Sequence, residues 1–430
     1  MGLIRKIKAS PLFKQSSIYL ISDGISKAIP FFFLPVISYY ISPADYGILT
    51  NYNVLVQILS VFCYSTTTVI IPVIYVKYEK EKLQTFISNI LLLNATVSLL
   101  LLMLVVFFST SINKFTSIPL IYQLLSVISV LFASFTQVNL VIWGCDEKPV
   151  YFGATHISQT VIDIGLASLL IIVILLGWQG RVISMVIANI LIGLFSIICL
   201  YKKGYVKFVI SKQFIVSIIG FSLPLLPHGL SFWIKSGADK LLLSNMCGLE
   251  KNALYSVAMT FGAIVSIFIV SFNNAFVPYL FKKIRGIETD RASAEAQKVF
   301  IVKLYRWLIL GVLLFVSICY VFSYWAIDLI YQDSYKGALV YLPYIFVGQV
   351  FIGYYSLFVN FVHYTQKTKV LGIITFSLTM IQVVASYLLI IAFGPIGSAM
   401  SSAAISICIC LCVVKYATSV YPLPWKKMFV

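Results

Sequence analysis

Charged residues are scarce in this chain. Asp, Glu, Lys and Arg make up 10% of its 430 residues, whereas 60% of the residues are hydrophobic. A soluble domain carries roughly 25% charged residues, and the mean hydropathy of +0.99 lies far on the apolar side. This composition excludes an ordinary soluble domain and predicts a protein that lives in a membrane.

Histidine and the common catalytic signatures are also sparse. With three His in all, a His-rich metal site is not expected, and the eight Cys form no Cys-x-x-Cys pair. The chain has no Walker A loop, no His-Glu-x-x-His and no Gly-x-Ser-x-Gly. We therefore expect no cofactor and no enzymatic activity. A membrane-embedded glycosyltransferase or polymerase stays open as an alternative, but the expected outside loops are short for such a catalytic site.

What the chain does have is a series of apolar stretches, each about as long as the 20 residues that a bilayer-crossing helix needs. Helices satisfy their backbone hydrogen bonds internally, as hydrocarbon demands. We expect an all-α integral membrane protein with twelve transmembrane helices. The expected spans are residues 16–41, 47–76, 84–110, 118–144, 150–176, 181–200, 213–236, 253–281, 299–325, 339–363, 370–393 and 397–417.

The basic residues predict the orientation, because Lys and Arg concentrate in cytoplasmic loops. Twelve spans place both termini on one side, and most of the 31 Lys and Arg fall there. The opposite side carries Lys114, Arg181, Lys240, Lys251 and Lys336. We expect both termini in the cytoplasm. The net charge of +17 then reflects topology and attraction to anionic membrane lipids, and no basic stretch with interleaved aromatics indicates nucleic-acid binding.

The chain resembles a duplication of six spans. Shifting the sequence by 206 residues places Ser65 on Ser271 and Pro72 on Pro278. Because six is even, the two halves would be parallel repeats about an axis along the membrane normal, with a substrate path between them. We expect an N-terminal lobe at 1–206 and a C-terminal lobe at 207–430.

The opening span of each half carries charges within the membrane. Asp23 and Lys27 lie one helical turn apart in the first span, and His228 and Lys235 lie in the seventh, with Asp239 four residues after Lys235. A charge at the helix centre costs roughly 2.5–3.5 kcal/mol, so such residues face a partner or a wet cavity. They either neutralise each other and simply pack, or line a central cavity. The similar placement in the opening span of each half favours the cavity.

Other spans carry stripes of amides and hydroxyls. A single stripe is as consistent with hydrogen bonds between helices as with a cavity lining, but several together favour a water-filled interior suited to a hydroxyl-rich substrate. The candidate cavity-lining residues outside the two charged spans are Asn53, Gln57, His156, Gln159, Asn274, Asn360 and Gln382.

Asp163 and Asp23 are the candidate ion-coupling residues, since transport without an ATP-binding motif must draw on an ion gradient or on removal of the product. Asp23 has Lys27 one turn away, whereas Asp163 has no cation on its own helical face. The lack of a partner favours Asp163 as a proton carrier. An ion pair between Asp163 and a lysine of another span is the alternative.

Two segments resemble a known family. The run Leu34 to Gly47 contains Ser42-Pro43-Ala44-Asp45-Tyr46-Gly47 and is similar to the end of the first span and the following turn of polysaccharide transporters. Gly237-Ala238-Asp239-Lys240-Leu241-Leu242-Leu243, followed by Tyr255-Ser256-Val257-Ala258, resembles the start of their second half, with Lys240 in place of the usual Arg. The family is the O-antigen and capsule repeat-unit flippases (Wzx-type) of the multidrug/oligosaccharidyl-lipid/polysaccharide (MOP) superfamily.

This resemblance implies a V-shaped, two-lobe bundle with alternating access in the bacterial inner (cytoplasmic) membrane. The implied activity, a step of lipopolysaccharide or capsule biosynthesis, moves an undecaprenyl-pyrophosphate-linked oligosaccharide from the cytoplasmic to the periplasmic leaflet. Family members place cations in the cavity, and by position Lys27 and Lys235 match them as pyrophosphate ligands. The implied partners are the lipid-linked glycan, H⁺ or Na⁺, and the polysaccharide polymerase machinery.

Two rival functions stay open. A cation-coupled exporter of drugs or other small molecules from the same superfamily would use Asp23, Asp163 and Asp239 as proton or sodium sites. A related lipid-carrier step, such as export of a teichoic-type polymer or a cell-wall precursor, is the second. A flippase should need Lys27 and Lys235, whereas a cation exporter should need the aspartates.

Overall fold

The computed structural model describes residues 11–65, 67–207, 209–289 and 294–428. Throughout these ranges the regular structure is helical. The chain divides into two compact units, Met1–Asn245 and Met246–Val430, each of which is described by itself. Among the described residues, eleven helices are long and apolar enough to cross a membrane.

The first unit contains the elements up to α12, whose last two residues lie beyond the unit boundary. They are α2 (Pro11–Ser38), α3 (Pro43–Ser60), η1 (Val61–Ser65), η2 (Thr68–Ile70), α4 (Ile71–Lys77), α5 (Lys80–Phe107), α6 (Ser109–Thr116), α7 (Leu120–Cys145), α8 (Pro149–Ser168), η3 (Leu169–Val173), α9 (Gly177–Lys202), α10 (Lys212–Ser222), η4 (Leu223–Leu225), α11 (Leu226–Trp233), η5 (Ile234–Ala238) and α12 (Asp239–Cys247).

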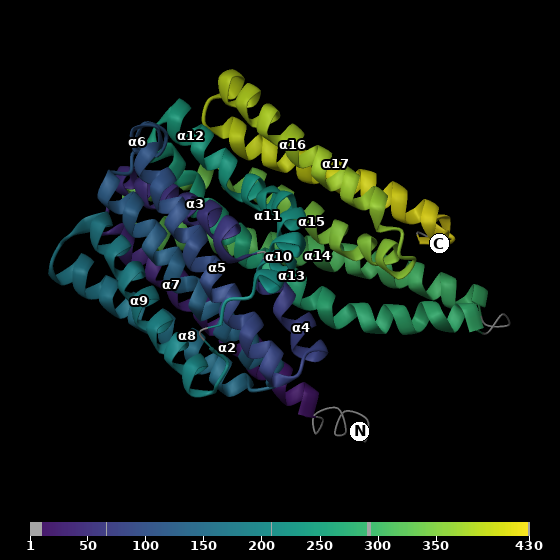
Figure 1. Ribbon diagram of the computed structural model, residues 1–430. Coiled ribbons are helices and arrows are strands. Elements are labelled where there is room, and N and C mark those ends of the chain that lie inside the picture. The colour runs from purple at the N-terminus through teal and green to yellow at the C-terminus, as the bar shows by residue number, and fades with distance from the viewer. Residues whose placement is uncertain (1–10, 66, 208, 290–293, 429–430) are drawn as a thin grey trace. The chain divides into compact units, whose positions relative to one another are not determined.

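The second unit is built from five long helices and two 3₁₀ segments. They are α13 (Leu249–Thr289), α14 (Ala294–Ile330), η6 (Asp333–Val340), α15 (Leu342–Tyr364), α16 (Thr368–Phe393), α17 (Ile396–Val420) and η7 (Trp425–Met428). The helices α16 and α17 lie side by side and α17 also packs against α15, as Figure 1 shows.

The turn that opens α3 explains why the sequence Ser-Pro-x-Asp begins a helix there. Ser42 is the N-cap: its Oγ accepts a hydrogen bond from the backbone N–H of Asp45 at 3.2 Å and donates to the Asp45 carboxylate at 2.9 Å. Pro43 occupies the first helical position, where its missing N–H costs nothing. The four residues therefore form a local helix start, as a capping box does.

The seventh expected span, residues 213–236, is not one helix. Pro224 lies in the 3₁₀ segment η4 and Pro227 in the first turn of α11, and a five-residue π-helix, η5, follows. Proline cannot donate to the helical ladder and clashes with the preceding turn, so the α-helix gives way to a 3₁₀ turn there, while helical structure continues from Lys212 to Cys247. For this reason none of the eleven long helices covers this span. The seventh span is therefore helical, as expected, but irregular.

Helical structure also extends into the stretch between the eighth and ninth expected spans, residues 282–298. The helix α13 continues to Thr289 and α14 begins at Ala294. Both helices therefore extend beyond the apolar segments into the hydrophilic, basic part of the chain, which is why they reach 41 and 37 residues.

The segment from α10 to α12 packs within the first unit. The Asn51 amide of α3 donates to Ser244 Oγ at 2.8 Å, and Trp233 Nε1 donates to the Val54 carbonyl at 3.0 Å. Packing therefore divides the chain after Asn245. The division into lobes 1–206 and 207–430, which rests on the sequence repeat, stays a prediction.

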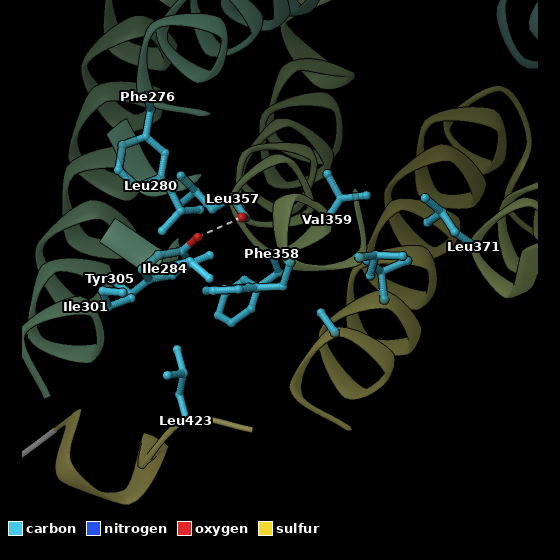
Figure 2. Packing of buried hydrophobic residues seen from close by; sticks show 14 of the residues in the cluster. Phe276, Leu280, Ile284, Ile301, Tyr305, Leu357, Phe358, Val359, Leu371 and Leu423 are labelled. Carbon is cyan, nitrogen blue, oxygen red and sulfur yellow. Dashed lines mark hydrogen bonds between the residues drawn. The ribbon is translucent and has the colours of Figure 1, made fainter. Parts of the chain in front are cut away.

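Each unit has its own apolar core. In the second unit, buried residues of α13, α14, α15 and α17 pack together with the C-terminal segment around Leu423 (Figure 2). The buried Tyr305 hydroxyl donates to the Leu357 carbonyl at 2.9 Å, which ties α14 to α15 inside this core. In the first unit, one core gathers α2, α3, α7 and α9, and another gathers α4, α5 and α7.

Candidate functional site

An ion pair lies in the middle of α2. The Lys27 ammonium is 2.6 Å from the Asp23 carboxylate, and the two side chains are 51% and 47% exposed within the described structure. Asp23 lies nine residues beyond Lys14, about 13 Å further along the helix axis. A pair of charges at that depth and exposure requires a wet or polar surface. That both residues line a cavity stays a prediction.

The helix α8 lies directly against this part of α2. Gly153 faces Ser22 so closely that a Cβ added there would lie 3.1 Å from the Ser22 Cβ. The ring of Tyr19, one turn before Ser22, makes an edge contact with the ring of Phe152, the residue before Gly153, with centroids 4.9 Å apart. A small residue at position 153 thus lets the two helices approach.

This contact brings His156 within electrostatic range of both Asp23 and Lys27. Its imidazole is half-buried, stacks on Phe152, and has a buried Nδ1 without a hydrogen-bond partner in the described part of the chain. The three residues therefore form one polar group, made of Asp23 and Lys27 on α2 and His156 on α8. The sequence showed these residues only as separate candidates.

The other polar stripes divide into exposed and buried residues. Asn53 and Gln57 lie one turn apart on α3 and are exposed in the first unit, and Asn274 on α13 is exposed in the second. Gln159 instead donates to Asn189 at 2.6 Å, and Asn189 donates to Ser129 at 2.7 Å. This chain joins α8, α9 and α7, so Gln159 acts as a link between helices.

Three candidate lining residues are buried. The first is Asn360 on α15, whose amide donates to Asn273 on α13 at 2.8 Å. The second is Gln382 on α16, whose backbone carbonyl accepts a hydrogen bond from the Ser401 hydroxyl of α17. Asp239 is 3% exposed at the start of α12. The π-helix before it adds a residue to the turn and rotates the following helix, which separates Asp239 from the face predicted for a regular helix. These three residues do not face an open surface in their units.

The side chains of His228 and Lys235 lie outside the described part of the structure. The backbone places His228 in α11 and Lys235 in η5, both within the first compact unit. The role of Lys235 as a pyrophosphate ligand stays a prediction from sequence.

Asp163 has a partner that the sequence analysis missed. The Arg181 guanidinium binds the Asp163 carboxylate through both of its terminal nitrogens, with Nη2 to Oδ2 at 2.9 Å, and Ser184 Oγ donates to the same carboxylate at 3.0 Å. The two charged side chains are 12% and 17% exposed. The expectation that Asp163 lacks a cation is wrong, and the alternative of an ion pair with another helix is closer, with arginine in place of lysine.

Local backbone geometry explains the pairing. After η3 the chain reverses through Leu175 and Gly177, which both have positive φ, and α9 begins at Gly177. A Cβ added to Gly180 would lie 3.2 Å from the Leu170 carbonyl oxygen, so α9 returns close beside the preceding helix. Arg181 therefore extends toward α8, although a count of loop charges assigns it to an outside turn.

A second polar group that the sequence analysis missed surrounds Asp146, just after α7. Its carboxylate accepts hydrogen bonds at 2.8 Å from both Tyr75 and Tyr205, and Lys148 and Lys203 lie 3.5 and 3.7 Å away. The Lys203 ammonium also lies 3.0 Å from the centroid of the Trp143 ring. The group joins α4, α7 and the segments that follow α7 and α9 at the expected cytoplasmic end.

The surroundings of Asp146 have opposing effects on its ionisation. Burial acts to raise its pKa, but the two tyrosine hydroxyls and the two lysines together hold the pKa below its usual value. Burial and the hydrogen bond to Asp146 raise the pKa of Tyr205 far above its usual value, so this phenol stays a donor. Asp146 thus favours the folded state at pH values above its usual pKa and loses this contribution as its carboxylate is protonated.

We expect acidification to reveal this contribution. The melting temperature of the detergent-solubilised protein should fall as the pH is lowered from about 5 to about 2. The melting temperature of Asp146→Asn should fall less steeply over that range, because this variant has no carboxylate at position 146 to protonate. Intrinsic fluorescence during heating measures both. The matched control Glu79→Gln removes an exposed carboxylate and should keep the wild-type slope. An unchanged slope in Asp146→Asn would contradict this role.

Within the described ranges, no three His, Cys, Asp or Glu side chains gather closely enough to hold a metal ion. The polar groups of the first unit instead offer an ammonium, an imidazole and exposed amides. These groups can bind anions and sugar hydroxyls.

The sequence and the fold resemble known proteins. The model of a family described as "Polysaccharide biosynthesis protein" matches residues 12–283. A protein of the Lsg locus of Haemophilus influenzae is 23% identical over 383 residues, which are 84% of this chain and 87% of that protein. An uncharacterised membrane protein of the same organism is 24% identical over 307 residues, covering 70% and 71%.

Two solved structures share the fold. An inward-facing multidrug resistance MATE family transporter of the MOP superfamily has a TM-score of 0.72 at 14% identity and covers 94% of both chains. The lipid II flippase MurJ in an inward closed conformation has a TM-score of 0.69 at 16% identity, covering 96% of this chain and 89% of its own. These likenesses confirm the expected all-helical, multi-span membrane fold.

Proposed function

Because this chain belongs to the polysaccharide biosynthesis protein family, we propose that it is a transporter that moves a lipid-linked oligosaccharide across the bacterial cytoplasmic membrane. The cargo is an undecaprenyl-pyrophosphate-linked repeat unit of an O-antigen or capsule, and the direction is from the cytoplasmic to the periplasmic leaflet. The fold shared with MOP transporters, one of which is a lipid II flippase, supports a non-enzymatic role.

The ion pair in α2 is the observation that carries this proposal. A pyrophosphate is a dense anion that must cross about 30 Å of hydrocarbon. Lys27 presents a half-exposed ammonium near the middle of a span and is neutralised by Asp23 while no substrate is bound. An arriving pyrophosphate can take the place of the Asp23 carboxylate as a partner of the ammonium.

The exposed amides support the glycan half of the cargo. Asn53 and Gln57 on α3 offer both donors and acceptors, which suit sugar hydroxyls. Such groups hold a neutral glycan without a strong charge preference, so they are compatible with different repeat units.

A cation-coupled exporter is the second candidate, and the exposed Asp23 carboxylate favours it. In that case Asp23 would bind a proton or a sodium ion and Lys27 would be dispensable. The two functions therefore make opposite demands on the same ion pair.

Reconstitution tests the proposal directly. Vesicles that carry a polyprenyl-pyrophosphate oligosaccharide in both leaflets are treated with an external glycosidase that cannot cross the membrane. Vesicles with the protein should lose the glycan of both leaflets, whereas protein-free vesicles keep the inner share. Protection of the inner share in both preparations would refute the proposal, and uptake of a cationic dye under a proton gradient would indicate the exporter instead.

A further inference from the structure

A cavity of about 370 Å³ lies within the second unit, between three of its helices. This volume falls in the lower part of the range of about 300–1,000 Å³ that is typical of small-molecule sites. Its lining is almost wholly apolar and rich in aromatic rings. The lining residues are Phe268, Ile269, Phe272 and Asn273 from α13, Trp307, Leu308, Gly311, Val312 and Phe315 from α14, and Gly353, Ser356 and Leu357 from α15.

Glycine keeps this groove open. A Cβ added to Gly311 would meet no atom within 4 Å, so the space in front of it is empty. Phe268, Phe272 and Trp307 are each about half exposed or more and border the entrance. The wall that Leu357 forms is well packed, because Leu357 belongs to the buried core and its carbonyl accepts the hydrogen bond from the Tyr305 hydroxyl (Figure 2).

The two polar residues of the lining are already engaged. Asn273 accepts a hydrogen bond from Asn360, and the Ser356 hydroxyl donates to the Ile352 carbonyl. An occupant of the groove therefore gains little from polar groups of its own and gains most from apolar surface. A hydrocarbon chain has this chemistry.

Basic residues continue the groove at one end. Lys303, Trp307, Gly311 and Phe315 recur every four residues, so they form one row along α14. Trp307 lies about 6 Å and Phe315 about 18 Å beyond Lys303 along the axis. On α13, Lys283 lies beyond Phe272 toward the end that adjoins the start of α14, with its ammonium 5.3 Å from the centroid of the Phe300 ring of α14.

We propose that this groove holds the polyprenyl chain of the lipid carrier, with the carrier phosphate beside Lys283 and Lys303 before the pyrophosphate reaches Lys27. This inference rests on the proposed function, because it names where the lipid part of the cargo binds. The charges fit a phosphate at the membrane surface, and the apolar row fits the first part of a chain that enters the hydrocarbon. The volume of about 370 Å³ suits a carrier with one chain per phosphate better than a phospholipid with two.

A photoreactive polyprenyl monophosphate tests the site without a glycan. The full-length protein in nanodiscs is irradiated with the probe, and the labelled peptides are identified by mass spectrometry. We expect labels on α13 and α14 near Phe272 and Trp307. Gly311→Phe should fill the groove and reduce this labelling at least about tenfold, since each buried CH₂ contributes about 0.8 kcal/mol.

Gly372→Phe is the matched control, because Gly372 on α16 also has open space in front of its Cα and does not line the groove. It should label like the wild type, and equal melting temperatures show that both variants fold. As a second variant, Lys283→Gln with Lys303→Gln should weaken labelling while keeping its position. Unchanged labelling in Gly311→Phe, or equal competition by a two-chain phosphatidylglycerol, would overturn the proposal.

The probe also separates the two proposals. It carries no sugar and no pyrophosphate, so its labelling does not depend on glycan transport. Absence of groove labelling in a protein that empties both leaflets in the glycosidase assay would refute the groove alone. Groove labelling in a protein that leaves the inner glycan untouched would refute the transport function alone.

Discussion

Lys27→Ala is expected to abolish glycan-lipid transport while the protein still accumulates in the membrane at the wild-type level. The ammonium offers a charge-assisted contact to the pyrophosphate, and loss of such a contact costs about 1.5–3 kcal/mol, or roughly 10- to 100-fold in transport rate. The side chain is 51% exposed, so its removal should disturb the fold little. The glycosidase assay and surface display of polysaccharide measure the effect.

Three further variants make this test specific. Lys27→Arg should keep most activity, because a positive charge at this position is sufficient. Lys80→Ala, which removes an exposed lysine at the start of α5, should behave like the wild type. Lys235→Ala should also abolish transport if the prediction from sequence holds. Full polysaccharide display by the Lys27→Ala, Lys235→Ala double variant would rule out a pyrophosphate site made of these lysines.

Asp23 then distinguishes the flippase from the exporter. Asp23→Asn leaves the Lys27 ammonium without its carboxylate partner and should allow a flippase to bind its anionic cargo at least as well. In a cation exporter the same change removes the coupling site and should abolish transport. The effects of Lys27→Ala and Asp23→Asn on transport therefore distinguish the flippase from the exporter.

Long apolar stretches made most of the fold predictable. A helix such as α5 is apolar over nearly its whole length. In a membrane such a segment has few alternatives to a helix, because its backbone hydrogen bonds must be satisfied internally. The seventh span is irregular for a local reason. Pro224 and Pro227 were visible in the sequence, but hydropathy averages over their effect on the backbone and does not reveal the 3₁₀ and π segments.

The candidate site was less predictable, because one sequence shows which residues share a helical face but not what faces them. Gln159 and Asn53 have similar side chains and similar positions in their stripes. One bonds to Asn189 on the neighbouring helix and the other is exposed. The difference depends on the rotation of α8 and α3 about their axes, which is decided by packing contacts such as that of Gly153 with Ser22.

Arg181 illustrates the same limit for charges. The positive-inside rule treats it as a loop residue, and its spacing from Asp163 gives no helical signal because a reversal of the chain lies between them. The pairing depends on the backbone at Leu175 and Gly177, where φ is positive. Glycine was a visible signal for a turn at 177, but leucine at 175 was not.

Arg181→Gln is expected to destabilise the protein severely, because it leaves the Asp163 carboxylate buried without its cation. Removal of one partner of a buried ion pair costs about 3–5 kcal/mol. Asp163→Asn should have a comparable effect for the same reason. The double variant should regain most of the lost stability, since it leaves neither charge unpaired. Melting temperatures and the amount of folded protein in membranes provide the four corners of a double-mutant cycle.

The same double variant decides whether Asp163 couples transport to an ion. A structural pair predicts that Asp163→Asn with Arg181→Gln still transports and responds to an imposed proton or sodium gradient as the wild type does. A coupling role predicts a stable protein whose transport no longer follows the gradient. Because Arg181 and Ser184 already occupy both oxygens of the Asp163 carboxylate, we expect the first result. The half-exposed Asp23, which a cation can reach, then becomes the residue to test for coupling.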